Sequence, residues 1–155
     1  MVHHWTRNQE SLYLNWPRPR PLPMLGLGGS VGTNNSAITA KVLVVNNYEE
    51  LDAWKDRVPG KIVLYNGAWD TSYGKTVQYR SRGAVKAAQY GAVACLVRSV
   101  TPFSLYTPHT GGTNYDATVP MIPAAAITVE DASYLRRVQD RGETNITVTL
   151  TMGAQ

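Results

Sequence analysis

The sequence predicts an α+β domain in which a strand-rich open barrel or sandwich is flanked by two helices. Short β-branched and apolar runs recur along the chain, two longer segments have helical periodicity, and glycine or proline separates most of them. At 155 residues, with 43% hydrophobic and 17% charged residues, the chain can bury a single core.

The N-terminal 24 residues are expected to form an extended lead-in, followed by one domain over residues 25–155. Proline occupies every second position of the stretch 17–23, which excludes helix and favours an extended backbone. Four glycines follow, at positions 26, 28, 29 and 32, but no helix begins behind them as a phosphate-binding loop requires. We therefore interpret these glycines as sites of close backbone approach or unusual dihedral angles.

Five strands are predicted within the domain, over residues 38–46, 61–66, 92–98, 123–127 and 144–152. In the last of them apolar residues alternate with threonines from residue 146 onward, so one face is expected to be buried. A short helical turn is expected between the first two strands, over residues 48–54.

Two helices are predicted, one over residues 77–90 and one beginning after Thr128. The first carries an apolar stripe and is followed by Gly91, where a C-terminal cap belongs. Thr128 is the candidate N-cap of the second helix, and the acidic pair behind it suits the positive end of the helix dipole. Gly142 is expected to end that helix.

The charge and cysteine content exclude several classes of protein. The net charge is +4, but the basic residues are scattered and form no stripe interleaved with aromatics, so nucleic acid is not an expected partner. No run of eighteen apolar residues occurs, so no membrane span is expected. Cys95 is the single cysteine and lies in an apolar run, where a small buried hydrophobe is the expected role.

No catalytic or metal-binding constellation is recognisable in the sequence. His3 and His4 are adjacent, His109 is solitary, and neither His-x-x-x-His nor Cys-x-x-Cys occurs, so no zinc site or other cofactor is expected in this chain. Ser104, His109 and Asp116 share one loop without a Gly-x-Ser-x-Gly elbow. The acidic pairs of the chain stand at predicted helix starts, where charge near the helix dipole is their expected role.

The stretch 99–120 is longer than most loops and carries Phe103, Tyr106, His109 and Tyr115. Aromatic and histidine side chains on such a loop are typical of a binding surface. Packing of the loop on its own domain explains the same composition equally well. Both interpretations stay open from the residues alone.

Two Asn-x-Ser/Thr triplets, at Asn34 and Asn145, are candidate glycosylation sites, and by themselves they only permit a route through the secretory pathway. The first residues lack the pattern of a signal peptide, so the chain is expected to begin within a longer protein.

Several long blocks carry a resemblance to a known family. They include LGLGGSVGT from residue 25, TVQYRSRGAVKAAQYGAVACLVRSVTPFSLYTPHTGG from residue 76 and VPMIPAAAITVEDASYL from residue 119. Together they resemble the protease-associated domain of the carboxypeptidase Q family, dizinc exopeptidases of unblocked dipeptides. The resemblance extends roughly from Trp5 to Ala154.

The resemblance implies a swivelling β/β/α domain without catalytic residues of its own. It implies that the two zinc ions and the catalytic glutamate belong to a peptidase domain of the same parent protein. The domain would then cover the active-site cleft, shape the access of peptide substrates and contribute to homodimer contacts. The surface for these roles is predicted at Ser104, Tyr106, His109, Thr110 and Gly111.

Two other functions compete with this one. Protease-associated domains also occur as interaction modules in sorting receptors and other membrane proteins, so a free-standing binding module is the main alternative. An independent hydrolase is the second, and it would require turnover by this chain alone.

Overall fold

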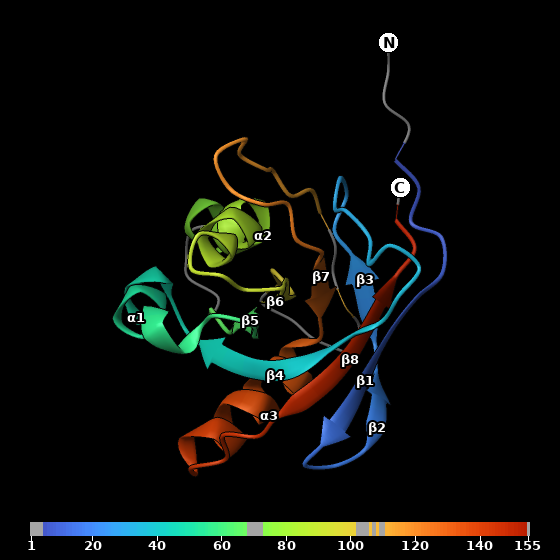
Figure 1. Ribbon diagram of the computed structural model, residues 1–155. Helices are drawn as coiled ribbons and strands as arrows, with labels where there is room; N and C mark the ends of the chain where they lie inside the picture. The colour runs from blue at the N-terminus through green and yellow to red at the C-terminus, as the bar shows by residue number, and fades with distance from the viewer. Residues whose placement is uncertain (1–4, 68–72, 102–105, 107, 109–110, 155) are drawn as a thin grey trace.

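The computed structural model describes residues 5–67, 73–101, 106, 108 and 111–154 (Figure 1). These residues form one eight-stranded sheet, in the order β2-β1-β8-β4-β5-β6-β7-β3, together with three α-helices and a short 3-10 helix. The predicted α+β class is therefore confirmed. The strands are β1 (Glu10–Trp16), β2 (Arg20–Leu22), β3 (Met24–Gly26), β4 (Ile38–Val45), β5 (Ile62–Tyr65), β6 (Ala94–Arg98), β7 (Ala124–Ile127) and β8 (Thr147–Met152), and the α-helices are α1 (Tyr48–Ala53), α2 (Tyr73–Ala88) and α3 (Val129–Asp140).

The sheet has a parallel half and an antiparallel half, which meet in strand β4. The parallel half consists of β4, β5, β6 and β7, and the antiparallel half consists of β2, β1, β8 and β4. Residues 38–41 of β4 pair with β8 and alternate between half-buried and exposed, whereas residues 42–45 pair with β5 and are all buried. The burial pattern of this one strand therefore records the change from one half to the other.

Helices cover both faces of the parallel half. Helices α1 and α2 lie on one side of it and α3 lies on the other (Figure 1). Small residues of α2, among them Ala84 and Ala87, pack in a core between this helix and one face of the parallel strands. Leu135 of α3 packs in a second core, on the other face. Strands β5 and β7 are consequently buried along their whole length, as parallel strands usually are.

The sheet curls so that β3, at one end of the strand order, returns beside β1 (Figure 1). Two side chains bridge this seam. The Glu10 carboxylate accepts the Gly26 backbone N–H at 3.1 Å, and Arg7 donates to the Gly26 carbonyl at 3.1 Å. Arg7 and Glu10 also form an ion pair at 3.5 Å. We call this pair the Arg7–Glu10 clasp. It supplies the Gly26 N–H and carbonyl with the hydrogen-bond partners that a neighbouring strand would otherwise provide.

The predicted helix ends are confirmed by their caps. The Thr128 hydroxyl accepts the Asp131 N–H at 3.1 Å and caps the start of α3. Gly142, with φ +99°, follows the end of α3, and Gly91, with φ +93°, follows the end of α2. Helix α2 begins at Tyr73, four residues earlier than predicted.

The expectation of two flanking helices is corrected by α1. The predicted turn over residues 48–54 forms a helix because Asn47 caps it, accepting the Glu50 N–H at 2.7 Å. Leu51 anchors the helix in the core, and the Glu50 carboxylate forms an ion pair with Arg136 of α3. These contacts give the described residues a third α-helix.

The N-terminal segment has more structure than the extended lead-in predicted for residues 1–24. Strand β1 lies between β2 and β8, and Leu12 and Leu14 are buried in the core. The prolines fall at the edge strand β2 and around it, where a missing N–H is tolerated. The residues before position 25 therefore contribute to the sheet, while the domain boundary between residues 24 and 25 stays a prediction.

Candidate functional site

The surface predicted on the long loop is only partly described by the structure. Ser104, His109 and Thr110 lie outside the described residues, as do the histidines at positions 3 and 4. Tyr106 is described and is 42% exposed, and Gly111 is half-buried. The geometry of the site is therefore built from the contacts of Tyr106 and Gly111.

Tyr106 contacts a buried carboxylate and an arginine from two distant elements. Its hydroxyl donates to Asp131 Oδ1 at 3.2 Å, and Arg20 of β2 donates to the Tyr106 hydroxyl. Arg20 Nη2 also donates to Asp131 Oδ1 at 2.7 Å. Asp131 is 1% exposed, so the carboxylate of the Arg20–Asp131 ion pair is almost inaccessible to water. We call these three residues the Tyr106 cluster.

The three side chains come together because of the fold. Asp131 stands in the first turn of α3, where a negative charge is favoured by the helix dipole. Arg20 lies on the edge strand β2 and extends over the Tyr134 ring, 5.8 Å from its centroid. Tyr106 has φ +59°, a backbone conformation that few non-glycine residues adopt. The cluster thus fixes one point of the long loop against the first turn of α3.

A second attachment of the loop lies at Gly111 and uses the glycine-rich segment. Gly28 N–H donates to the Gly111 carbonyl at 2.7 Å, and Thr113 N–H donates to the Gly28 carbonyl at 2.9 Å. Gly28 and Gly112 form a parallel bridge. A β-carbon on Gly111 would lie 2.3 Å from the Arg80 guanidinium carbon, so a side chain there would displace Arg80. The interpretation of the glycines as sites of close backbone approach is confirmed at Gly32, where a β-carbon would lie 2.5 Å from the Met152 carbonyl oxygen.

Tyr115 serves the fold, which is the packing alternative for this part of the loop. Its hydroxyl accepts the Val31 N–H at 3.0 Å and donates to the Ile122 carbonyl at 2.7 Å. Its ring packs against the core that α2 covers, and burial raises the pKa of its phenol. Of the other aromatic candidates, Phe103 lies outside the described residues.

Several further candidates have structural roles. Cys95 is fully buried, and burial raises the pKa of its thiol well above the ordinary value, as suits a small core residue. Asp116 accepts both the N–H and the hydroxyl of Thr118, at 2.8 and 2.7 Å, and so shapes its own turn. Within the part of the chain that the structure describes, no three His, Cys, Asp or Glu side chains are placed to hold a metal ion.

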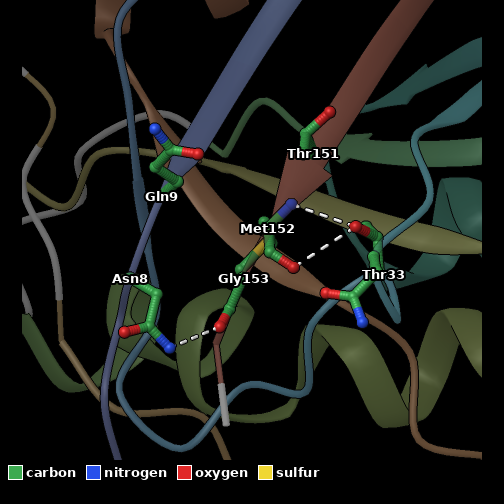
Figure 2. Close-up of a pocket in the computed structure, with 7 residues that line it drawn as sticks. Asn8, Gln9, Thr33, Thr151, Met152 and Gly153 are labelled. Carbon is green, nitrogen blue, oxygen red and sulfur yellow. Dashed lines mark hydrogen bonds between the residues drawn. The ribbon is translucent and has the colours of Figure 1, made fainter.

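A hollow of about 580 Å³ lies where the two ends of the described chain meet (Figure 2). Asn8 donates to the Gly153 carbonyl at 2.7 Å, and Thr33 Oγ1 contacts both the backbone N–H and the carbonyl of Met152. Figure 2 shows that amides, hydroxyls and backbone groups line it. Such a lining can form hydrogen bonds with a neighbour but offers no titratable group for acid–base chemistry.

Arg20 was not predicted as a site residue, and Asp131 was expected only as a charge at a helix start. The sequence places Arg20 among alternating prolines and Asp131 at a helix start, where an exposed charge is the ordinary expectation. The ion pair depends on a separation of 111 residues, which no local pattern reveals. Both sequon asparagines, Asn34 and Asn145, are exposed, as a glycan acceptor must be.

Within the described residues, every helix is too short or too polar to cross a membrane. No family model matches the chain.

Curated relatives match almost the whole chain. Carboxypeptidase Q of Xenopus laevis is 52% identical over 153 residues, which is 99% of this chain and 32% of the relative. Carboxypeptidase Q of Homo sapiens is 47% identical over 154 residues, with the same coverage of both chains. The chain therefore spans about one third of the length of the curated relatives it matches.

Solved structures match over the same extent. A peptidase M28 precursor from Shewanella amazonensis has a TM-score of 0.90 and 29% identity, covering 99% of this chain and 36% of its own. An aminopeptidase from Aneurinibacillus has a TM-score of 0.68 and 22% identity, covering 98% of this chain and 32% of its own, which shows a shared fold. The chain is homologous to a region that makes up about one third of carboxypeptidase Q.

Proposed function

We propose that this chain is a non-catalytic protease-associated domain of a carboxypeptidase Q-type zinc peptidase. The observation that carries the proposal is identity of about one half over 99% of the chain, confined to one third of each relative. A peptidase needs ligands for its metal and a base for its water, and the described residues place no such group together. The two zinc ions and the catalytic glutamate are accordingly assigned to the remainder of the parent protein.

The proposed role is to cover the active-site cleft and shape the access of peptide substrates, with homodimer contacts as a second task. The Tyr106 cluster supports this role because it holds Tyr106 at a defined position while 42% of the Tyr106 surface stays exposed. An exposed aromatic ring whose hydroxyl is already held within the domain is well suited to contact a peptide or a neighbouring domain. The fold type is proposed to be the swivelling β/β/α arrangement of protease-associated domains.

The compartment proposed for the parent is the secretory pathway, ending outside the cell or in the lysosome. The exposed sequon asparagines Asn34 and Asn145 are compatible with it. Occupancy of either site in protein taken from its source would support the proposal.

The full-length parent protein provides the test of the substrate-access role. Tyr106→Ala should raise KM for a dipeptide several-fold while kcat changes little, because access and not chemistry is altered. Tyr13→Ala is the matched control, since Tyr13 is also 42% exposed but lies on the antiparallel half. His109→Ala extends the test to the rest of the predicted loop surface. Unchanged KM in both loop variants would contradict the proposed role.

Metal content and native size test the accessory nature of the domain. The isolated chain should bind no zinc at stoichiometric level and hydrolyse no dipeptide, whereas the parent should contain two zinc ions per chain. An antibody against the chain should detect a native species several-fold heavier than 17.0 kDa. Peptidase activity of the chain alone would reject the proposal in favour of an independent hydrolase.

A further inference from the structure

The side chain of Trp16 is exposed because of a bulge in strand β1. Leu12 and Leu14 point into the core, and simple alternation would send Trp16 to the same side. The register of β1 against β8 shifts between Leu14 and Trp16, so Trp16 pairs with Thr147 and is 51% exposed. A bulge re-aims a side chain in this way, and here it turns a large aromatic ring toward solvent.

Asn145 lies two positions before Thr147, the cross-strand partner of Trp16. Ile146 directly precedes β8, is 1% exposed, and its carbonyl accepts the Val42 N–H at 2.8 Å, whereas Asn145 before it is exposed and Thr147 after it is half-buried. The end of β1 and the start of β8 are adjacent, as Figure 1 shows. Within paired strands, a residue at this offset is a diagonal neighbour about 7–8 Å away, and Asn145 stands at this offset just before β8 begins.

The backbone of Asn145 is held in place. Its N–H donates to Glu143 Oε1 at 2.8 Å, and its carbonyl accepts from the Thr147 hydroxyl at 2.8 Å. Its side chain is exposed, two positions along the chain from the partner of Trp16. Asn145-Ile146-Thr147 is also one of the two sequons of the chain.

We propose that Asn145 carries an N-linked glycan whose first N-acetylglucosamine packs on the indole ring of Trp16. The electron-rich face of an indole attracts the weakly positive C–H groups of a sugar ring, and covering the ring removes apolar surface from water. The glycan thus covers the surface that the bulge exposes. The proposal rests on the secretory route of the proposed function.

The second sequon provides an internal contrast. Asn34 stands in a turn with φ +56°. It borders a shallow hollow, and the described residues that line this hollow include Met121 but no aromatic ring. A glycan on Asn34 would therefore extend into solvent without a platform. The structure assigns a stabilising glycan to Asn145 and a merely solubilising one to Asn34.

The test uses the chain secreted from eukaryotic cells with a signal sequence, in Asn34→Gln and Asn145→Gln backgrounds that isolate each site. Glycopeptide mass spectrometry should find Asn145 occupied. Enzymatic removal of the glycan at Asn145 should lower Tm by about 2–4 °C, whereas removal at Asn34 should leave Tm unchanged. In Trp16→Ala, removal of the Asn145 glycan should no longer change Tm, and Trp16→Phe should restore part of the shift.

A second measurement does not depend on the stability of the variants. In the wild-type glycoprotein, ring protons of the first sugar should show upfield ring-current shifts that Trp16→Ala abolishes. An unoccupied Asn145, an equal Tm shift with and without Trp16, or unshifted sugar protons would each overturn the proposal. None of these outcomes bears on zinc content or dipeptide hydrolysis by the parent, so a failure here is distinguishable from a failure of the proposed function.

Discussion

The parallel half of the sheet is buried on both faces, whereas the antiparallel half keeps one face in solvent. Strand β5 is buried at every residue, while β8 alternates strictly between buried and half-buried positions. The parallel strands β4, β5 and β6 follow one another through α1 and α2, close in sequence, but β1 pairs with β8 across nearly the whole chain, from Glu10 to Met152. The difference shows that one half is specified by neighbouring segments and the other by the meeting of both chain ends.

The two halves also close in different ways. Helices seal the parallel half with apolar side chains from both sides. The antiparallel half closes against β3 through the polar Arg7–Glu10 clasp, and Arg20 of β2 reaches α3 through Asp131. Polar closure depends on geometry and on pH, while apolar closure depends mainly on buried area.

The largest expected effect tests whether β1 is as much a part of the core as β5. Leu14→Ala and Leu64→Ala should each reduce the free energy of unfolding by about 2–5 kcal/mol, because both side chains are fully buried. Urea denaturation measures both. Tyr13→Ala, on the exposed face of β1, should cost less than about 1 kcal/mol. If Leu14→Ala reduced the free energy of unfolding only slightly while Leu64→Ala reduced it strongly, β1 would contribute little to the core, as expected of a lead-in.

A smaller effect tests the close approach of the glycine-rich segment to β8. In Gly32→Ala the new β-carbon would lie 2.5 Å from the Met152 carbonyl oxygen, so the backbones must separate at a cost of about 1–3 kcal/mol. Gly112→Ala is the matched control, since its nearest neighbour is 3.9 Å away and the change should stay within about 0.5 kcal/mol. Thermal unfolding of the two variants makes the comparison, and equal losses would contradict it.

Removal of the N-terminal cap of α3, at Thr128, should have a smaller effect on stability still. Thr128→Ala removes the oxygen that accepts the Asp131 N–H, which should cost about 1 kcal/mol of stability. Thr128→Ser keeps the oxygen and should retain most of it. Guanidinium denaturation distinguishes the two, and a serine variant as unstable as the alanine variant would assign the loss to packing instead of capping.

The smallest effect is a pH dependence located at the clasp. Burial raises the pKa of Glu10, against the opposing effects of the Gly26 N–H and Arg7. The folded state therefore binds the proton more tightly, and this contribution is complete below the ordinary glutamate pKa and lost as pH rises through the raised one. Glu10→Gln removes the titrating carboxyl. As pH rises through the raised pKa of Glu10, the free energy of unfolding of the wild type should therefore fall relative to that of the variant.

Asp116 provides a control of opposite sign for this measurement. The Thr118 N–H and hydroxyl lower the pKa of its carboxyl, so its contribution is present above the ordinary aspartate pKa and lost as pH falls through the lowered one. Unfolding free energies of Glu10→Gln and Asp116→Asn against pH should therefore deviate from wild type in opposite directions. Parallel deviations would show that the clasp is not the origin of the pH dependence.

The sequence predicted those elements whose signals lie within a few residues of one another. The β-branched run of β4, the alternation of β8 and the cap at Thr128 were all confirmed, because period and capping are local properties. Strand β1 was missed although Leu12 and Leu14 alternate with exposed residues, since the prolines behind it favoured an extended connector. Within the candidate site, Tyr106 and Gly111 were named from the sequence, but their partners were not.

The sequence by itself determined the α+β class, most of the parallel half with its helices, and the homology that the comparisons confirm. Only the tertiary structure decided that residues 10–26 complete the sheet, that Asp131 is buried against Arg20, and that a bulge exposes Trp16. The physical reason is that burial and pairing in the antiparallel half depend on contacts over more than a hundred residues. A charge or an aromatic side chain acquires its environment only when those distant segments meet.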